Sequence, residues 1–123
     1  MESNLRENLK NRLMNGEFSC KKELTLSIIS GKWKSAIVYH LGHDGTLRYG
    51  ELKRRLDPSV SHRVLTKQLR ELEQDGIIAR KTYPTVPPRV DYFVTDMGLT
   101  LLPLLNELLD WGEAHIDFYR KRL

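Results

Sequence analysis

Apolar residues recur at helical spacing through most of this chain, beginning near the N-terminus. Leu5, Leu9 and Leu13 stand four residues apart on an otherwise polar segment, and Gly16 interrupts the pattern. A second helical stretch is expected over residues 21–29. The pattern therefore predicts a short N-terminal helix with one apolar stripe, followed by a second helix.

The third predicted helix has a wider apolar face than the first. Trp33, Ile37 and Leu41 recur every four residues, and Val38 broadens the face that they share. A face of this width indicates a helix that is embedded in a core. The His-Asp-Gly sequence at 43–45 ends the helix.

Two further helices are predicted on either side of a short break at 57–59. The first covers 49–56, and the Asp-Pro-Ser break follows because proline cannot continue a helix and disfavours helical angles in the residue before it. Ser61 is a favourable N-cap for the second helix, whose buried face carries Leu65, Leu69 and Leu72. Gly76 ends this helix because glycine tolerates a positive φ.

After residue 76 the pattern changes from helical to alternating. Residues 77–83 and 89–94 are predicted as two strands, joined by a rigid, proline-containing turn at 84–88. In the second strand, alternation places on one face Val90, Tyr92 and Val94. A hairpin directly behind two consecutive helices is typical of a wing.

The C-terminal region is predicted to be helical, with an unusually wide apolar face. Thr95 caps its start, Asp96 is favourably placed against the helix dipole, and Pro103 either kinks the helix or begins a second segment. Beyond residue 103 the apolar face is too wide for a helix on the surface of a small domain. We therefore expect a second copy of the chain to cover part of it, and the predicted dimerisation residues are Leu5, Leu9, Leu13, Leu105, Leu108, Leu109, Trp111 and Ile116.

The composition is that of one soluble domain. The chain has 123 residues, of which 40% are hydrophobic and 29% charged. Its apolar runs are too short to span a membrane and its polar N-terminus is unlike a secretory signal, so a cytoplasmic protein is expected. The single cysteine, Cys20, excludes an internal disulfide framework and a cysteine-rich zinc module.

The positive charge is concentrated between Arg48 and Arg70. This stretch holds seven cations against two anions, a net charge of +5, whereas the whole chain carries +4. A basic stretch by itself is typical of a solvated helix face, but here the cations lie on two consecutive helices with a short break between them. This arrangement favours a helix-turn-helix that binds double-stranded DNA.

The exposed face of the second of these helices carries the predicted sequence-specific contacts. The major groove of DNA admits one helix, and its first two turns approach the base edges. We therefore predict base-edge contacts from Ser61, His62, Arg63, Thr66 and Lys67. The predicted contacts with backbone phosphates come from Lys53, Arg54, Arg55 and Arg70. Arg89 in the wing is predicted to reach the adjacent minor groove, where narrow A·T-rich segments attract guanidinium groups.

Neither a metal site nor an enzyme is indicated. His40 and His43 lie beside Asp44, but no further ligand completes a metal site. Ser35 and Ser61 lack the glycine-rich elbow of a hydrolase, and no paired carboxylates accompany them. We expect no enzymatic activity and no cofactor.

Two alternatives to a simple DNA-binding regulator remain open. A winged-helix protein-interaction module would tend to replace the cations of 61–70 by apolar or mixed residues, and here the cations are intact. A ligand-gated regulator would bind a small molecule between its DNA-binding and dimerisation parts. No feature of the sequence separates this second alternative from gating by a thiol.

Several short motifs together resemble the signature of a known family. In order, the chain carries Gly-Lys-Trp at 31–33, Arg-Tyr-Gly-Glu-Leu at 48–52, Leu-Thr at 65–66 with Leu69 and Leu72-Glu73, Asp-Gly-Ile at 75–77 with Arg80, Pro-Pro-Arg-Val-Asp-Tyr at 87–92, Thr95 with Gly98, and Trp-Gly at 111–112. Over roughly residues 20–112 these resemble the HxlR-type transcriptional regulators, a branch of the MarR-like winged-helix proteins.

The resemblance implies both an architecture and a function. The expected fold is mainly α with a small β-hairpin wing, a winged helix-turn-helix in which the terminal helices form a dimer. Its expected parts are an N-terminal dimerisation helix at 1–20, a DNA-binding core at 21–94 and C-terminal dimerisation helices at 95–123. The implied function is a bacterial regulator, a repressor, that binds palindromic operator DNA as a homodimer.

Cys20 is the candidate sensor that the resemblance implies. Members of the family typically carry a cysteine just before the Gly-Lys-Trp segment, and in some of them it senses electrophiles, hypochlorite or quinones by oxidation, intersubunit disulfide formation or alkylation. Lys21 and Lys22 follow Cys20, and cations and helix starts favour the reactive thiolate. Many members have proline where this chain has Lys21. The alternative is a buried and unreactive cysteine, and the inducer stays open.

Overall fold

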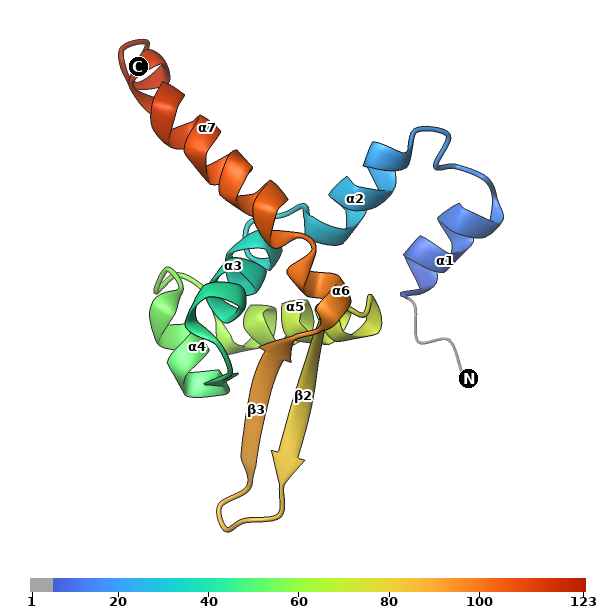
Figure 1. Cartoon of the computed structure of the whole chain (residues 1–123), viewed down its shortest axis with the longest axis vertical. Coiled ribbons are helices and arrows are strands. Elements are labelled where there is room, and N and C mark those ends of the chain that lie inside the picture. Colours follow the sequence, from blue (N-terminus) through green and yellow to red (C-terminus); the bar gives the residue numbers. More distant parts are fainter. Residues whose placement is uncertain (1–5) are drawn as a thin grey trace.

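The computed structural model describes residues 6–123 and contains, within them, seven helices and three strands (Figure 1). The helical body lies at the centre, the β2–β3 hairpin extends from one end of it, and α7 projects away at the opposite end. Among the described residues, no helix combines the length and the apolar character that crossing a bilayer demands. The elements are α1 (Glu7–Met14), α2 (Lys21–Ile29), α3 (Lys34–Asp44), β1 (Leu47–Arg48), α4 (Tyr49–Arg55), α5 (His62–Gln74), β2 (Ile78–Tyr83), β3 (Arg89–Val94), α6 (Asp96–Leu99) and α7 (Leu102–Arg120).

The three strands form one antiparallel sheet in the order β1-β3-β2. The β2–β3 hairpin pairs from Ile78 with Val94 down to Tyr83 with Arg89. The sequence predicted these two strands but not β1, whose two residues are too few to show an alternating pattern. Through β1 the chain enters α4 beside the wing, because Arg48 lies opposite Asp91 of β3.

The core lies between α3, α4, α5 and the sheet, as the apolar periodicity predicted. Its fully buried side chains include, from three helices and one strand, Ile37, Val38, Leu52, Leu65, Leu69, Leu72 and Ile78. The stripe of α5 therefore faces inward along the whole helix, and its opposite face is left to solvent.

Side-chain caps and a tight turn set the limits of α5. The Ser61 hydroxyl oxygen accepts a hydrogen bond from the Val64 amide at 3.1 Å, which confirms the predicted N-cap. Before it, the Asp57 carboxylate accepts a bond from the Ser59 amide at 2.8 Å, and this bond lowers the pKa of Asp57. After the helix, Gly76 has a φ of 78°, the left-handed conformation that the sequence predicted for it.

The apolar residues of the terminal helices divide into two groups. Leu9 and Leu105 are only 3% and 4% exposed within a single chain. The expectation that they face a second copy is therefore wrong, because their own chain already covers them. Leu5 lies outside the described residues. The remaining predicted dimerisation residues are between 42% and 57% exposed, namely Leu13, Leu108, Leu109, Trp111 and Ile116.

Pro103 begins a new helix rather than kinking a continuous one. It is the second residue of α7, where the absence of an amide hydrogen costs nothing because the first amides of a helix have no partner within it. Thr95 caps the preceding short helix α6 by accepting a hydrogen bond from the Gly98 amide at 3.0 Å. Thr95 also donates to the Gly76 carbonyl at 2.6 Å, which links α6 to the end of α5.

Candidate nucleic-acid interface

The first half of α5 presents its cations to solvent. Arg63 and Lys67 are exposed, as are the capping Ser61 and the first helical residue, His62, whereas Thr66 is half-buried. Neither cation, nor Arg70 further along, forms an ion pair with any of residues 6–123. Within these described residues their charge is therefore not held in an ion pair and is available to an anionic partner.

The start of α5 is tied to α4 by an aromatic contact. The hydroxyl oxygen of Tyr49 lies 2.7 Å from Nδ1 of His62, and the two rings are 5.0 Å apart. One ring nitrogen of His62 is thus already in contact with Tyr49. Val64 on the same helix is exposed. The charge pattern of the sequence did not indicate Val64, although an exposed apolar side chain at this position is suited to contact with a thymine methyl group.

The three basic residues of α4 differ in their surroundings. Arg54 is exposed and Lys53 half-buried, and neither forms an ion pair within the described residues. Arg55 has two partners of its own: its Nε lies 2.8 Å from an Asp44 carboxylate oxygen, and its Nη1 donates to the Glu51 carbonyl at 3.0 Å. A contact between Arg55 and a phosphate, as predicted from the sequence, would therefore compete with the ion pair between Arg55 and Asp44.

Arg89 is bound within the wing rather than directed from its tip. Its guanidinium donates two hydrogen bonds of 3.0 Å to the buried Asp91 carboxylate and lies 4.9 Å from the centre of the Tyr83 ring. The hydrogen bonds from Arg89 lower the pKa of Asp91, against the effect of burial. The apex of the wing is Val86, which is 99% exposed. In the free chain the Arg89 side chain, 44% exposed, is thus paired with Asp91, and its contact with the minor groove stays a prediction.

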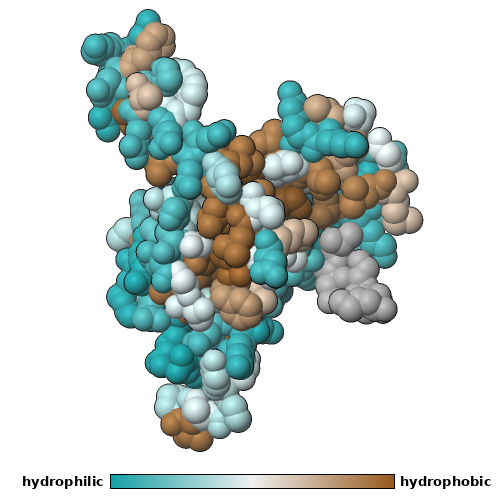
Figure 2. Space-filling model, in the orientation of Figure 1, coloured by the Kyte–Doolittle hydropathy of each residue, from teal (hydrophilic) through white to brown (hydrophobic). Residues whose placement is uncertain are grey.

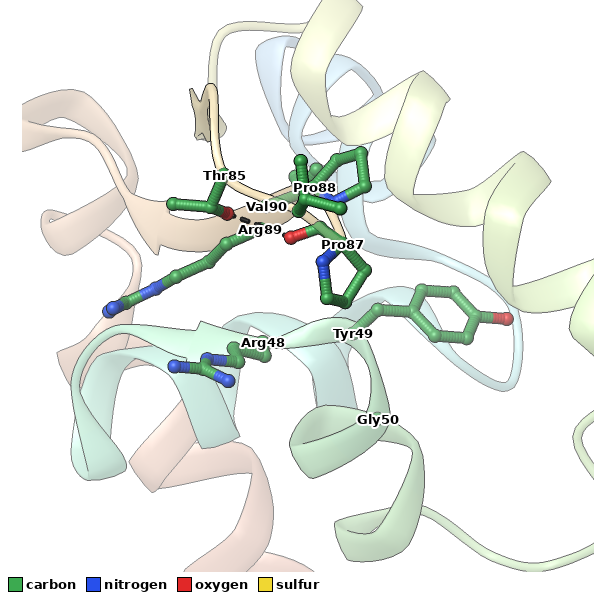
Figure 3. Close-up of a pocket in the computed structure, with 9 residues that line it drawn as sticks. Arg48, Tyr49, Gly50, Thr85, Pro87, Pro88, Arg89 and Val90 are labelled. Carbon is green, nitrogen blue, oxygen red and sulfur yellow. Dashed lines mark hydrogen bonds between the residues drawn. The ribbon is translucent and has the colours of Figure 1, made fainter.

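A basic groove separates the wing from the start of α4 (Figure 3). In the close-up, the side chains of Arg48 and Arg89 extend to the same side, and Tyr49 points the other way. A second, adjoining pocket shares Arg48, Gly50 and Arg89 with this groove and is also lined by Thr46, Arg54 and the acidic Glu51. The groove and the adjoining pocket bring together cations from β1, α4 and β3 that are up to 41 residues apart in sequence.

Arg48 is a candidate DNA contact that the sequence pattern did not indicate. It lies within the basic stretch, so its charge was visible, but the strand that places it beside the wing was too short to be predicted. Its side chain forms no ion pair with the described residues, in contrast with Arg89 across the groove.

Cys20 is exposed and stands at the N-cap position of α2. Its carbonyl accepts a hydrogen bond from the Glu23 amide at 2.9 Å, and the two lysines that follow it are exposed. The alternative of a buried cysteine is therefore wrong.

The histidines of α3 do not form a metal site with the described residues. His43 Nε2 lies 3.0 Å from the Asn106 side-chain oxygen, and no cluster of three or more potential metal ligands occurs in residues 6–123.

This architecture defines a class of protein. Two consecutive helices, α4 and α5, are separated by a six-residue turn, the second helix exposes cations, and a β-hairpin follows it directly. These are the parts of a winged helix-turn-helix, in which the second helix enters the major groove of DNA.

Comparisons with known proteins identify the family. Residues 28–119 match the HxlR-like helix-turn-helix family. The uncharacterized HTH-type transcriptional regulator YdeP of Bacillus subtilis (strain 168) is 45% identical over 115 residues, which cover 89% of this chain and 88% of YdeP. The chain belongs to the HxlR-like helix-turn-helix family and is a helix-turn-helix transcriptional regulator.

Solved structures support the same assignment of fold. The redox regulator HypR in its reduced form is 44% identical, with a TM-score of 0.78 over 83% of this chain and 99% of HypR. Its oxidized form is 47% identical, with a TM-score of 0.72 over 77% of this chain and 96% of HypR. A transcriptional regulator of the MarR family from Porphyromonas gingivalis W83 is 37% identical, with a TM-score of 0.72 over 77% of this chain and 91% of that protein.

Proposed function

We propose that this regulator is a cytoplasmic repressor that binds palindromic operator DNA as a homodimer. The observation that carries the proposal is the uncompensated charge of Arg63, Lys67 and Arg70 on the exposed face of α5. A winged-helix protein-interaction module would tend to carry apolar or mixed residues on that face, whereas phosphates and guanine edges bind unpaired cations directly. The observation thus favours DNA over a protein partner.

The residues divide by role according to their position. Ser61, His62, Arg63, Thr66 and Lys67 occupy the first two turns of α5 or its cap, and we assign them to base edges or to phosphates close by. Phosphate contacts are assigned to Lys53, Arg54, Arg70 and, from the basic groove, Arg48. Arg55 and Arg89 are assigned to supporting roles because each is already paired with a carboxylate.

The exposed face of α7 supports a homodimer. Its exposed apolar side chains extend along much of the helix, and apolar surface is gathered near the junction of α7 with the body (Figure 2). An apolar face of this extent on a projecting helix is unusual for a monomer. A second copy that covers it would present two copies of α5 to half-sites about one helical turn apart. In this proposal the segments 1–20 and 95–123 form the dimer and residues 21–94 form the DNA-binding core.

The proposal is tested by selecting duplexes from a random library and measuring the oligomeric state. We expect the selected duplexes to contain an inverted repeat, and analytical ultracentrifugation to give twice the mass of one chain. Replacing Leu108 and Trp111 together by Ser should shift the mass toward one chain and weaken operator binding. A monomeric wild-type protein that selects no duplex at low salt contradicts the proposal.

A thiol switch at Cys20 is a second element of the proposed function. Cys20 is exposed, and the similar HypR is a redox regulator with solved oxidized and reduced forms. Because each chain has one cysteine, a disulfide must join two molecules. Two Cys20 thiols then lose two protons and two electrons to an oxidant of the diazene class, such as diamide, which becomes the hydrazine. Alkylation by an electrophile instead forms one carbon–sulfur bond with loss of the thiol proton.

The switch is tested with diamide and a Cys20→Ser control. Oxidation of the wild type should produce a linked dimer on a non-reducing gel and change the operator shift, and a reducing agent should reverse both effects. Cys20→Ser should bind the operator normally and ignore diamide. The thiol switch is wrong if diamide weakens operator binding by Cys20→Ser as much as it weakens binding by the wild type. It is also wrong if diamide leaves Cys20 of the wild type unmodified.

A further inference from the structure

A cluster of ion pairs joins α1 to the far end of α5. Arg6, the N-cap residue of α1, forms a two-pronged contact with Asp75, the C-cap residue of α5. Its Nε donates to Oδ1 at 3.0 Å, and its Nη2 lies 2.8 Å from Oδ2. The Asp75 side chain is completely buried. A carboxylate without solvent depends on this one guanidinium for its compensation.

Two further contacts extend the cluster to α2 and α3. Lys34, the first residue of α3, is 95% buried along its side chain, and its ammonium lies 2.7 Å from the Glu71 carboxylate. Arg6 lies 4.0 Å from the same carboxylate and donates to the Ser27 carbonyl at 3.0 Å. Two cations and two anions thus balance in charge, and they bring three helices to the last turn of α5.

The cluster is suited to setting geometry more than to adding stability. Buried ion pairs recover little more than the cost of their own desolvation, but the hydrogen bond from Nε of Arg6 to Oδ1 of Asp75 is directional, and Oδ2 accepts no hydrogen bond and meets Arg6 only as an ion pair. The helix α5 has 13 residues and is about 20 Å long, and its continuous backbone hydrogen bonding fixes the orientation of one end relative to the other. A displacement of Asp75 therefore alters how Arg63 and Lys67 are presented at the other end.

The N-terminal helix has few other attachments to its own chain. Leu9 is the one buried residue of α1, which lies wholly within the described part of the chain. Arg12 on the same helix lies 3.7 Å from a carboxylate oxygen of the exposed Glu17 and forms no ion pair with the described residues of α5. Arg6 is therefore the side chain that pairs this N-terminal helix with the carboxylates at the end of α5.

We propose that Arg6 is a positioning residue for operator binding, acting through Asp75 on the orientation of α5. The segment of the chain that carries Cys20 follows α1 directly, so this contact also links the N-terminal region to the DNA-binding surface. The inference rests on the proposed function, since it assigns to Arg6 an effect on operator recognition. It requires no direct contact between Arg6 and DNA.

The test compares Arg6→Met with Arg12→Met, which removes the same charge from the same helix. We expect Arg6→Met to lower operator affinity by about tenfold, or about 1.4 kcal/mol, while non-specific duplex affinity stays within twofold. The slope of log affinity against log salt should not change, because no phosphate contact is lost. Arg6→Lys should recover part of the affinity, and Arg12→Met should match the wild type in every measurement.

The double variant R6M/D75N separates positioning from folding. Arg6→Met alone leaves Asp75 as an unpaired buried charge and should lower the thermal midpoint, whereas the double variant removes both charges and should recover it. We expect operator affinity to stay low in the double variant even so. If its affinity recovers together with its midpoint, or if Arg6→Met reduces the salt slope, the positioning role is wrong. Failure of the wild type to bind any duplex would instead contradict the proposed function.

Discussion

The two halves of the recognition helix carry charge in opposite ways. In the first half, Arg63 and Lys67 are exposed and unpaired within residues 6–123. At the other end the carboxylates all have partners: Glu71 meets Lys34, Glu73 meets Arg80 at 3.3 Å, and Asp75 meets Arg6. Unpaired carboxylates on this helix would repel DNA phosphates. The fold neutralises them with cations from other elements, so the field of the helix is positive where its first turns are presented.

The same contrast separates arginines that sequence alone cannot tell apart. Arg54 and Arg55 are neighbours on α4, yet one is unpaired and the other is held by Asp44. Arg48 and Arg89 line one groove, yet only Arg89 is bound to a carboxylate. An arginine is a candidate DNA contact when the fold leaves its charge uncompensated. Four measurements would break or sharpen this distinction.

The largest expected effect is a loss of stability caused by a substitution on the inward face of α5. Leu69 is 1% exposed, and Leu69→Ala should lower the free energy of unfolding by about 2–5 kcal/mol because it leaves a cavity in the core. Arg63→Ala on the opposite face should change it by less than about 0.5 kcal/mol. Urea unfolding of both variants measures the difference. Equal losses would mean that the exposed face also stabilises the fold.

Arg63→Ala is expected to affect recognition instead of stability. A bidentate contact between arginine and guanine is worth about 1–3 kcal/mol of discrimination, so the preference at one base position per half-site should relax by that amount. Fluorescence anisotropy against single-base variants of the selected operator measures it. An unchanged preference at every position would remove Arg63 from the base-contacting set.

Arg54→Met and Arg55→Met test whether pairing distinguishes the two cations. Loss of a phosphate contact should weaken binding to all sequences alike and reduce the salt slope by about 0.9 for Arg54. Arg55 should show no change in slope, because its charge is already matched by Asp44. Titrations at several salt concentrations compare the two. Identical slopes for both variants would mean that the ion pair of Arg55 opens when DNA binds.

The smallest effect is expected from protonation at the second half of α5. Burial raises the pKa of Glu71, but the hydrogen bond and charge of Lys34, with Arg6 and Lys67 near, outweigh it and leave the pKa lowered. A lowered pKa in the folded state means that ionised Glu71 stabilises the fold above the unfolded pKa of about 4.3 and loses this contribution as pH falls through the folded value. The thermal midpoint of Glu71→Gln should lie below that of the wild type at pH 7, and the gap should close as the pH falls from the unfolded pKa through the lower, folded pKa. A gap that stays constant with pH would contradict this role.

The sequence predicted most helices and both long strands because their periodicity is local. The caps at Ser61 and Thr95 and the left-handed Gly76 were also predictable, since each depends on bonds between residues a few positions apart. The strand β1 was missed because two residues carry no pattern, and with it the role of Arg48. The burial of Leu9 and Leu105 within a single chain was not predicted. The spacing of apolar residues shows that a face is covered, but not whether the same chain or a second copy covers it.

The amino-acid order alone determined the family, the basic stretch and the helix that bears it, because motif spacing and charge density are properties of neighbouring residues. Which charges remain available was decided only by the tertiary structure. Asp44 meets Arg55 and Asp75 meets Arg6 across 11 and 69 positions of the chain. Coulomb attraction acts over a few ångströms of space whatever the distance along the chain, so the folded arrangement selects the cations that are free to bind DNA.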